Sequence, residues 1–127
     1  MIDRKTIADP RTHYGDGKHA TAGFKWQRIT GAINILGLLF LIWLVVSLAG
    51  ADRATFVTTV ANPFVALATA IMVVVAVIHM RIGMREVIED YVHDERLNRL
   101  SLWLNTLFCA LIVVASLAAL AKIVFWG

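Results

Sequence analysis

Residues 63–80 read PFVALATAIMVVVAVIHM, an almost unbroken apolar run that contains no charged side chain. The charge-free block around this run extends from residue 54 to residue 80, and residues 29–51 and 100–121 form two further blocks of the same kind. Each block is at least as long as the ~20 residues that a helix needs to cross the hydrocarbon core of a bilayer. The blocks do not alternate between apolar and polar residues, as barrel strands do. Because only helices and closed barrels satisfy their backbone hydrogen bonds in lipid, the sequence predicts an all-α membrane protein with three transmembrane helices.

The composition supports this fold class. Hydrophobic residues make up 59% of the chain and charged residues 17%, whereas a soluble domain is about half apolar and about a quarter charged. The net charge of +3 does not indicate nucleic-acid binding, because the basic residues flank the apolar blocks. The first block follows a long polar stretch, so we do not expect it to be a signal peptide.

The boundaries predict one membrane domain, residues 25–127, preceded by a polar segment of residues 1–24. We expect its helices at about residues 25–49, 63–91 and 100–124. This assignment implies short connections that themselves lie close to the membrane surface.

The connections carry helix-start signals. Asn62 is a favoured N-cap and Pro63 suits the first helical position, so the second helix is predicted to begin there. Residues 54–61 are then expected to form a separate short stretch at the interface, and residues 92–99 a charged loop.

The basic residues predict the orientation of the helices. The N-terminal segment carries Arg4, Lys5, Arg11, Lys18, Lys25 and Arg28, and the second loop region carries Arg81, Arg85, Arg96 and Arg99. The first loop and the C-terminus add one each, Arg53 and Lys122. Since cytoplasmic segments are enriched in Lys and Arg, the N-terminus is predicted to be cytoplasmic and the C-terminus periplasmic.

Small and polar side chains along the blocks favour contacts between helices. Asn34 and Asn105 are predicted to form hydrogen bonds between helices, and Cys109 to be a small packing residue. Glycine, alanine and serine at other positions allow close packing, for example at Gly31 and Gly37. These features are typical of a subunit that packs against other helices.

His79 is the one ionisable side chain that lies clearly within a block. Such groups are costly in lipid and are candidates for function. A neutral imidazole could ligate a metal or a haem iron, or it could be hydrogen-bonded to a serine or a backbone carbonyl of a neighbouring helix. A bis-histidine haem would require its second ligand from another subunit, because His13, His19 and His93 lie in polar segments and are predicted to be exposed or interfacial.

Four further residues near the cytoplasmic helix ends each allow two interpretations. Gly83, four residues after His79, leaves room for a flat ring or for a neighbouring helix. Tyr91 suits an aromatic belt or a hydrogen bond to a quinone carbonyl. Asp90 falls near the helix face of His79, or it belongs to a solvated helix end that pairs with Arg81 and Arg85. Arg28 is either a topology-setting charge or a partner for a haem propionate or lipid phosphate.

Residues 79–93, HMRIGMREVIEDYVH, resemble the signature of the small hydrophobic membrane anchor subunits of succinate dehydrogenase. That signature is a His, a Gly four residues later, and an Asp-Tyr pair that ends the second transmembrane helix. Most of the chain is similar to this family, including the basic N-terminal segment, an Arg that opens the first helix, and the three helices. The length of the N-terminal tail is outside the signature.

The resemblance implies an anchor in succinate:ubiquinone oxidoreductase, respiratory complex II of the tricarboxylic acid cycle, in a bacterial inner membrane. Its partners would be the flavoprotein subunit, the iron–sulfur subunit, the larger cytochrome b anchor subunit and membrane lipid, without nucleic acid. His79 would be an axial ligand of haem b, shared with the larger anchor, with Gly83 in contact with the haem and Arg28 at a propionate. Tyr91 would bind ubiquinone with support from Asp90, and the chain would supply no catalytic residue of the dehydrogenase.

Other functions remain open at this point. An anchor of a quinol:fumarate reductase would share the fold and differ in quinone type and haem content. A cofactor-free structural subunit would use His79 only for packing. A transporter fragment is disfavoured, because transporters place carboxylates or broken helices near the midplane, and no Asp or Glu lies inside the three blocks.

Overall fold

The computed structural model describes residues 17–127, with side chains from residue 22 onward. This part of the chain is all-helical, with α3 (Gly17–Leu48), α4 (Arg53–Val60), α5 (Pro63–Tyr91) and α6 (Glu95–Trp126). Three helical segments are long and apolar enough to span a membrane, namely Ala22–Leu48, Pro63–Tyr91 and Glu95–Trp126. The predicted fold class and its three candidate spans are therefore confirmed for the described residues.

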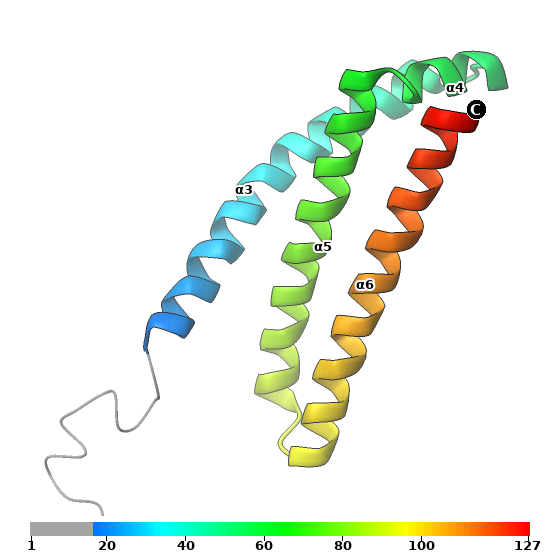
Figure 1. Cartoon of the computed structure of the whole chain (residues 1–127). Coiled ribbons are helices and arrows are strands. Elements are labelled where there is room, and N and C mark those ends of the chain that lie inside the picture. The colour runs from blue at the N-terminus through cyan, green and yellow to red at the C-terminus, as the bar shows by residue number, and fades with distance from the viewer. Residues whose placement is uncertain (1–16) are drawn as a thin grey trace, which may run out of the picture.

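The three long helices form an up-down-up arrangement around α5. Figure 1 shows α5 and α6 as an antiparallel pair, with α3 crossing α5 obliquely. The short α4 lies across the end of the bundle that also holds the C-terminus, and it contacts both α5 and α6. The start of α3 and the α5–α6 turn both lie toward the opposite end, where α3 diverges from the other two helices (Figure 1).

Side-chain caps fix where α4 and α5 begin. Gly50 adopts a φ of 76° in the turn after α3, a left-handed conformation that favours glycine. The Asp52 carboxylate accepts a hydrogen bond from the Thr55 amide at 2.9 Å and starts α4. Asn62 accepts from the Phe64 amide at 3.0 Å, and Pro63 follows as the first helical residue. The second helix spans the expected residues, Pro63–Tyr91, and the separate short stretch expected before it is the helix α4.

The predicted charged loop over residues 92–99 is wrong, because α6 begins at Glu95 rather than near residue 100. Asp94 is the N-cap, and its carboxylate accepts from the amides of Arg96 and Leu97 at 3.0 Å each. The Asn98 amide then donates to the Val92 carbonyl at 2.9 Å and ties the tight turn to the end of α5. The charged residues of this segment therefore belong to the first turns of α6 and do not form a loop.

The first helix also begins earlier than expected, at Gly17 instead of near residue 25. Residues 17–24 contain no proline and continue the helix beyond its apolar part. The rest of the predicted N-terminal segment, residues 1–16 with His13, lies outside the described residues, and His19 lies where side chains are not described. His93 is exposed, as predicted.

Few side chains are buried within the chain itself. The buried apolar residues are Leu44, Val60, Val77, Ile88 and Cys109, and many large apolar side chains on α3, α5 and α6 are exposed. Cys109 is 3% exposed, and its thiol donates to the side-chain Oδ1 of Asn105 at 3.6 Å, so its predicted packing role is confirmed. Apolar faces of this extent suit lipid and the helices of partner subunits.

Candidate functional site

His79 lies on α5 at the surface that meets α3. Its Nδ1 is 3.1 Å from the Thr30 hydroxyl, and Thr30 itself is only 3% exposed. Nε2 forms no hydrogen bond with a described residue. Nδ1 thus has a hydrogen-bond partner and Nε2 has none among the described residues. The first fact agrees with a packing role for His79, and the second agrees with a role as a ligand.

Two glycines lie where α3 and α5 meet near this histidine. A Cβ atom added to Gly31 would lie 3.4 Å from His79 Cε1. A Cβ atom added to Gly83 would lie 3.1 Å from Gln27 Nε2, so α3 approaches the place where the haem contact was expected. The Gln27 Oε1 atom is buried and has no hydrogen-bond partner among the described residues.

Sequence reasoning missed both Gln27 and Thr30. They share one helical face with Gly31 and Asn34, at the i, i+3, i+4, i+7 spacing of a single stripe. A polar and glycine-bearing stripe in an otherwise apolar span was the available signal. Asn34 does not form the predicted interhelical hydrogen bond with any described residue. It instead lines a cavity of ≈ 340 Å³, together with Gly37 and Met72.

Asp90 and Tyr91 end α5, about 18 Å along the helix from His79 at ~1.5 Å per residue. Both side chains are exposed, Tyr91 to 78%, and neither is hydrogen-bonded to another described side chain. The neighbouring hollow at the α5–α6 turn has a volume of ≈ 610 Å³, and neither residue lines it. The described part of this chain therefore does not enclose Tyr91 by itself.

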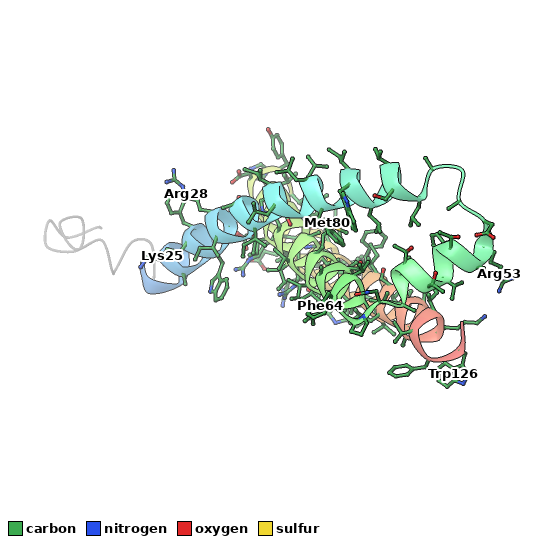
Figure 2. All side chains as sticks on the ribbon, turned by 90° about the horizontal axis from the view of Figure 1, so that it is seen from above. Lys25, Arg28, Arg53, Phe64, Met80 and Trp126 are labelled. Atoms are coloured by element: carbon green, nitrogen blue, oxygen red, sulfur yellow. The ribbon has the colours of Figure 1, made fainter. Side chains whose placement is uncertain are left out.

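Arg28 stands apart from His79. Its guanidinium lies 4.5 Å from the centre of the Phe24 ring, a cation–π contact within α3. Figure 2 shows its side chain pointing outward from α3. Because Thr30 is only two residues further along, Arg28 lies within about one helical turn of the level of His79.

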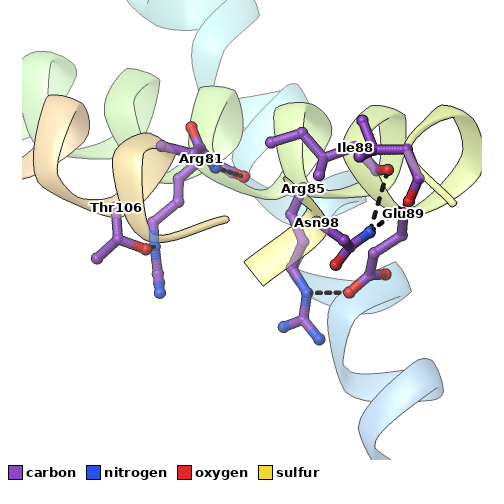
Figure 3. Close-up of polar contacts among 8 residues, drawn as sticks. Arg81, Arg85, Ile88, Glu89, Asn98 and Thr106 are labelled. Atoms are coloured by element: carbon purple, nitrogen blue, oxygen red, sulfur yellow. Dashed lines mark hydrogen bonds and ion pairs between the residues drawn. The ribbon is translucent and has the colours of Figure 1, made fainter. Parts of the chain in front are cut away.

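Arg81 and Arg85 lie on the side of α5 that faces α6, beside Asn105 and Thr106 (Figure 3). Arg85 pairs with Glu89 at 2.9 Å, an exposed pair that contributes little stability. Arg81 donates to the Thr106 hydroxyl at 3.4 Å, and its backbone carbonyl accepts from Asn105 at 3.0 Å. The predicted interhelical hydrogen bond of Asn105 is confirmed.

These residues suit a haem more than an isolated metal ion. No group of three or more His, Cys, Asp or Glu side chains that could hold a metal ion occurs in residues 17–127. A haem shared between subunits needs only one axial ligand from each, and His79 Nε2 forms no hydrogen bond with a described residue, whereas Nδ1 contacts Thr30. The residues present therefore fit one half of a bis-histidine site.

The fold and the site together define a multi-pass membrane anchor subunit, with apolar faces for partners and a lone histidine at a helix–helix contact. A model of the succinate dehydrogenase/fumarate reductase transmembrane subunit family matches residues 3–119. The chain belongs to this family, as a membrane anchor subunit of succinate dehydrogenase.

Similar curated proteins bear the same description. The succinate dehydrogenase hydrophobic membrane anchor subunit of Rickettsia conorii is 32% identical over 107 residues, which cover 84% of this chain and 85% of the relative. The protein of that description from Rickettsia felis is 32% identical over 94 residues, covering 74% and 78%. The one from Rickettsia bellii is 28% identical over 105 residues, covering 83% and 84%. No solved structure matches the chain closely enough to add to these comparisons.

Proposed function

We propose that this chain is the small anchor of a succinate:ubiquinone oxidoreductase, that His79 is an axial ligand of a haem b shared with the larger anchor, and that Tyr91 and Asp90 belong to its ubiquinone site. The observation that carries the proposal is the contact between His79 Nδ1 and the buried Thr30 hydroxyl. It leaves Nε2 available on a span that offers no second histidine within the described apolar segments.

The haem end of the proposal uses three residues of this chain. A bound haem b would supply a one-electron redox centre inside the membrane. His79 would hold its iron, and Arg28 would balance the charge of a propionate from a position near the same level. Gly83 would allow close approach, although Gln27 of α3 shares that space.

The quinone end uses the exposed end of α5. Ubiquinone takes up two electrons and two protons to become ubiquinol, and the electrons would come from succinate through the flavoprotein and iron–sulfur subunits. The Tyr91 phenol would donate a hydrogen bond to a quinone carbonyl and so favour the charge that develops there on reduction. Asp90, its neighbour in sequence, would accept hydrogen bonds that orient this site. The exposure of both side chains supports a pocket completed by partner subunits.

The proposed orientation places the N-terminus and the α5–α6 turn in the cytoplasm of a bacterial cell, and α4 and the C-terminus in the periplasm. The start of α3 and the α5–α6 turn share one end of the bundle, and the excess of Arg and Lys lies at that end. The flavoprotein and iron–sulfur subunits would dock there, beside Tyr91.

A reduced-minus-oxidised optical spectrum of the complex, purified through this subunit, tests the haem ligand. His79→Ala should remove or alter a low-spin b-type signal that the wild-type complex shows. His93→Ala is the matched control, because His93 is exposed in the α5–α6 turn, and it should leave the signal unchanged. A wild-type spectrum from His79→Ala would refute the ligand role and leave the anchor role in place.

A further inference from the structure

We propose that Thr30 is a positioning residue for His79, which keeps the ring proton on Nδ1 and leaves the lone pair of Nε2 for the iron. The inference rests on the proposed ligand role of His79 and adds to it a residue on a different helix. It is drawn from the three contacts of the Thr30 hydroxyl, taken together with the close approach of Gly31 to the ring.

Donor and acceptor capacities determine the direction of the hydrogen bond. The Thr30 oxygen lies 2.7 Å from the Trp26 carbonyl oxygen and 3.2 Å from the Gln27 carbonyl oxygen. Both carbonyls can only accept, so they take the single hydroxyl hydrogen. The remaining contact, 3.1 Å from His79 Nδ1, must then be donated by the ring. A neutral imidazole carries one N–H, so Nε2 is unprotonated.

The location of Thr30 makes this arrangement durable. Thr30 is 3% exposed, so water cannot readily replace either partner. The bond to the carbonyl four residues earlier fixes the threonine rotamer within α3. Gly31 lets α3 approach the ring closely, because a Cβ atom at that position would lie 3.4 Å from His79 Cε1. This close approach keeps Thr30 within hydrogen-bond distance of the imidazole.

The hydrogen bond should also tune the electronic properties of the ligand. An acceptor on Nδ1–H increases the electron density on the ring and makes the other nitrogen a stronger electron donor to a bound metal, as outer partners of ligating histidines do. A stronger donor stabilises ferric over ferrous iron. Loss of the acceptor should therefore shift the haem midpoint potential to more positive values.

The test compares four variants in the purified complex by redox titration of the haem, by low-spin EPR of the oxidised haem, and by haem content. Thr30→Val and Thr30→Ala remove the acceptor, and Thr30→Ser retains it. Thr69→Val is the matched control, since Thr69 on α5 makes the same bond to the carbonyl four residues earlier, at 2.8 Å, and forms no hydrogen bond with another helix among the described residues.

We expect a positive shift of the midpoint potential and altered EPR g-values in Thr30→Val and Thr30→Ala, with wild-type values in Thr30→Ser and Thr69→Val. Wild-type potential and g-values in Thr30→Val or Thr30→Ala would overturn the proposal. Failure of both to assemble, with normal assembly of Thr30→Ser, would also overturn it and assign the hydroxyl to folding. His79→Ala, measured in parallel, separates the two hypotheses: a wild-type haem spectrum there refutes the ligand role, whereas loss of haem there with an unchanged potential in Thr30→Val refutes only the role of Thr30.

Discussion

Gly37 of α3 lies against Met72 of α5 so closely that a Cβ atom on Gly37 would stand 2.9 Å from Met72 Cγ. Real Cβ atoms do not approach a carbon atom to this distance, so any larger residue must displace the methionine or separate the helices. In lipid, where apolar surface gains nothing by leaving the solvent, such close contact is a main source of helix association. The crossing of α3 over α5 is therefore set partly by this glycine.

Gly37→Ala should weaken the packing of α3 on α5 by about 1–3 kcal/mol, the usual range for an added methyl group in a filled contact. The measurement is the thermal stability of the detergent-purified complex. Gly23→Ala is the control, because a Cβ atom there meets nothing within 4 Å, and it reports the helix propensity gain alone. If Met72→Ala fails to reduce the cost of Gly37→Ala in the double variant, the close contact is not its cause.

A second prediction tests whether Gly83 contacts only Gln27 of α3 or also the proposed haem. Its nearest contact within the chain is Gln27 Nε2, at the end of a long side chain that can move. Gly83→Ala should therefore assemble normally, and it should lower haem content or shift the haem spectrum only if the haem also approaches this position. The comparison is made again in a Gln27→Ala background, where the protein contact is absent. A haem spectrum equal to wild type in both backgrounds would assign Gly83 to helix packing.

Much of the fold could be predicted because lipid imposes simple rules. Long charge-free blocks mark the spans, and Asn62 with Pro63 marks the start of α5. Asp94 is an equally good N-cap, but the charged residues that follow it favoured the prediction of a loop, whereas Glu95–Arg99 is the start of α6. Composition reports where a chain leaves lipid, whereas capping residues report where its helix begins.

The candidate site could be predicted only in part. The residues of the motif on α5 share one helix, so their spacing alone relates His79 to Gly83 and Asp90. The contact with Thr30 joins residues that lie 49 positions apart. The polar stripe from Gln27 to Asn34 marks the contacting face of α3. The apolar span of α5 carries no matching stripe that identifies its partner helix, so the pairing of α3 with this face of α5 needed the structure.

The third prediction concerns pH and the short helix α4. A hydrogen bond with the Thr55 side chain, followed by one from the Thr55 amide, lowers the pKa of Asp52 below its ordinary value. A carboxyl group whose pKa is lowered on folding contributes its stabilisation above the ordinary pKa and loses it as pH falls through the lowered value. Amide hydrogen exchange at Thr55, corrected for the intrinsic pH dependence of exchange, should therefore lose protection only in the acid range below that ordinary value. Asp52→Asn keeps the acceptor without the charge, so the acid-dependent loss should disappear, and its persistence would assign the transition to another group.

The last prediction concerns Tyr91 at the exposed end of α5. Tyr91→Phe removes only the phenol, and a neutral hydrogen bond is worth about 0.5–1.5 kcal/mol, so ubiquinone reduction should fall roughly 2–10-fold in kcat/KM. Succinate oxidation with an artificial dye that accepts electrons before the membrane should be unchanged, because the flavoprotein chemistry lies upstream. Haem content should be unchanged as well, since His79 lies about 18 Å away along the helix at ~1.5 Å per residue.

Tyr91→Ala distinguishes the quinone role from that of an interfacial anchor. An aromatic belt residue acts through its ring, which phenylalanine retains and alanine lacks. Equal losses of quinone reduction in Tyr91→Phe and Tyr91→Ala, with both complexes intact, would place the function in the hydroxyl group. Full activity in Tyr91→Phe with reduced stability in Tyr91→Ala would instead identify Tyr91 as an anchor at the membrane surface, and the quinone hydrogen bond would then have to come from another subunit.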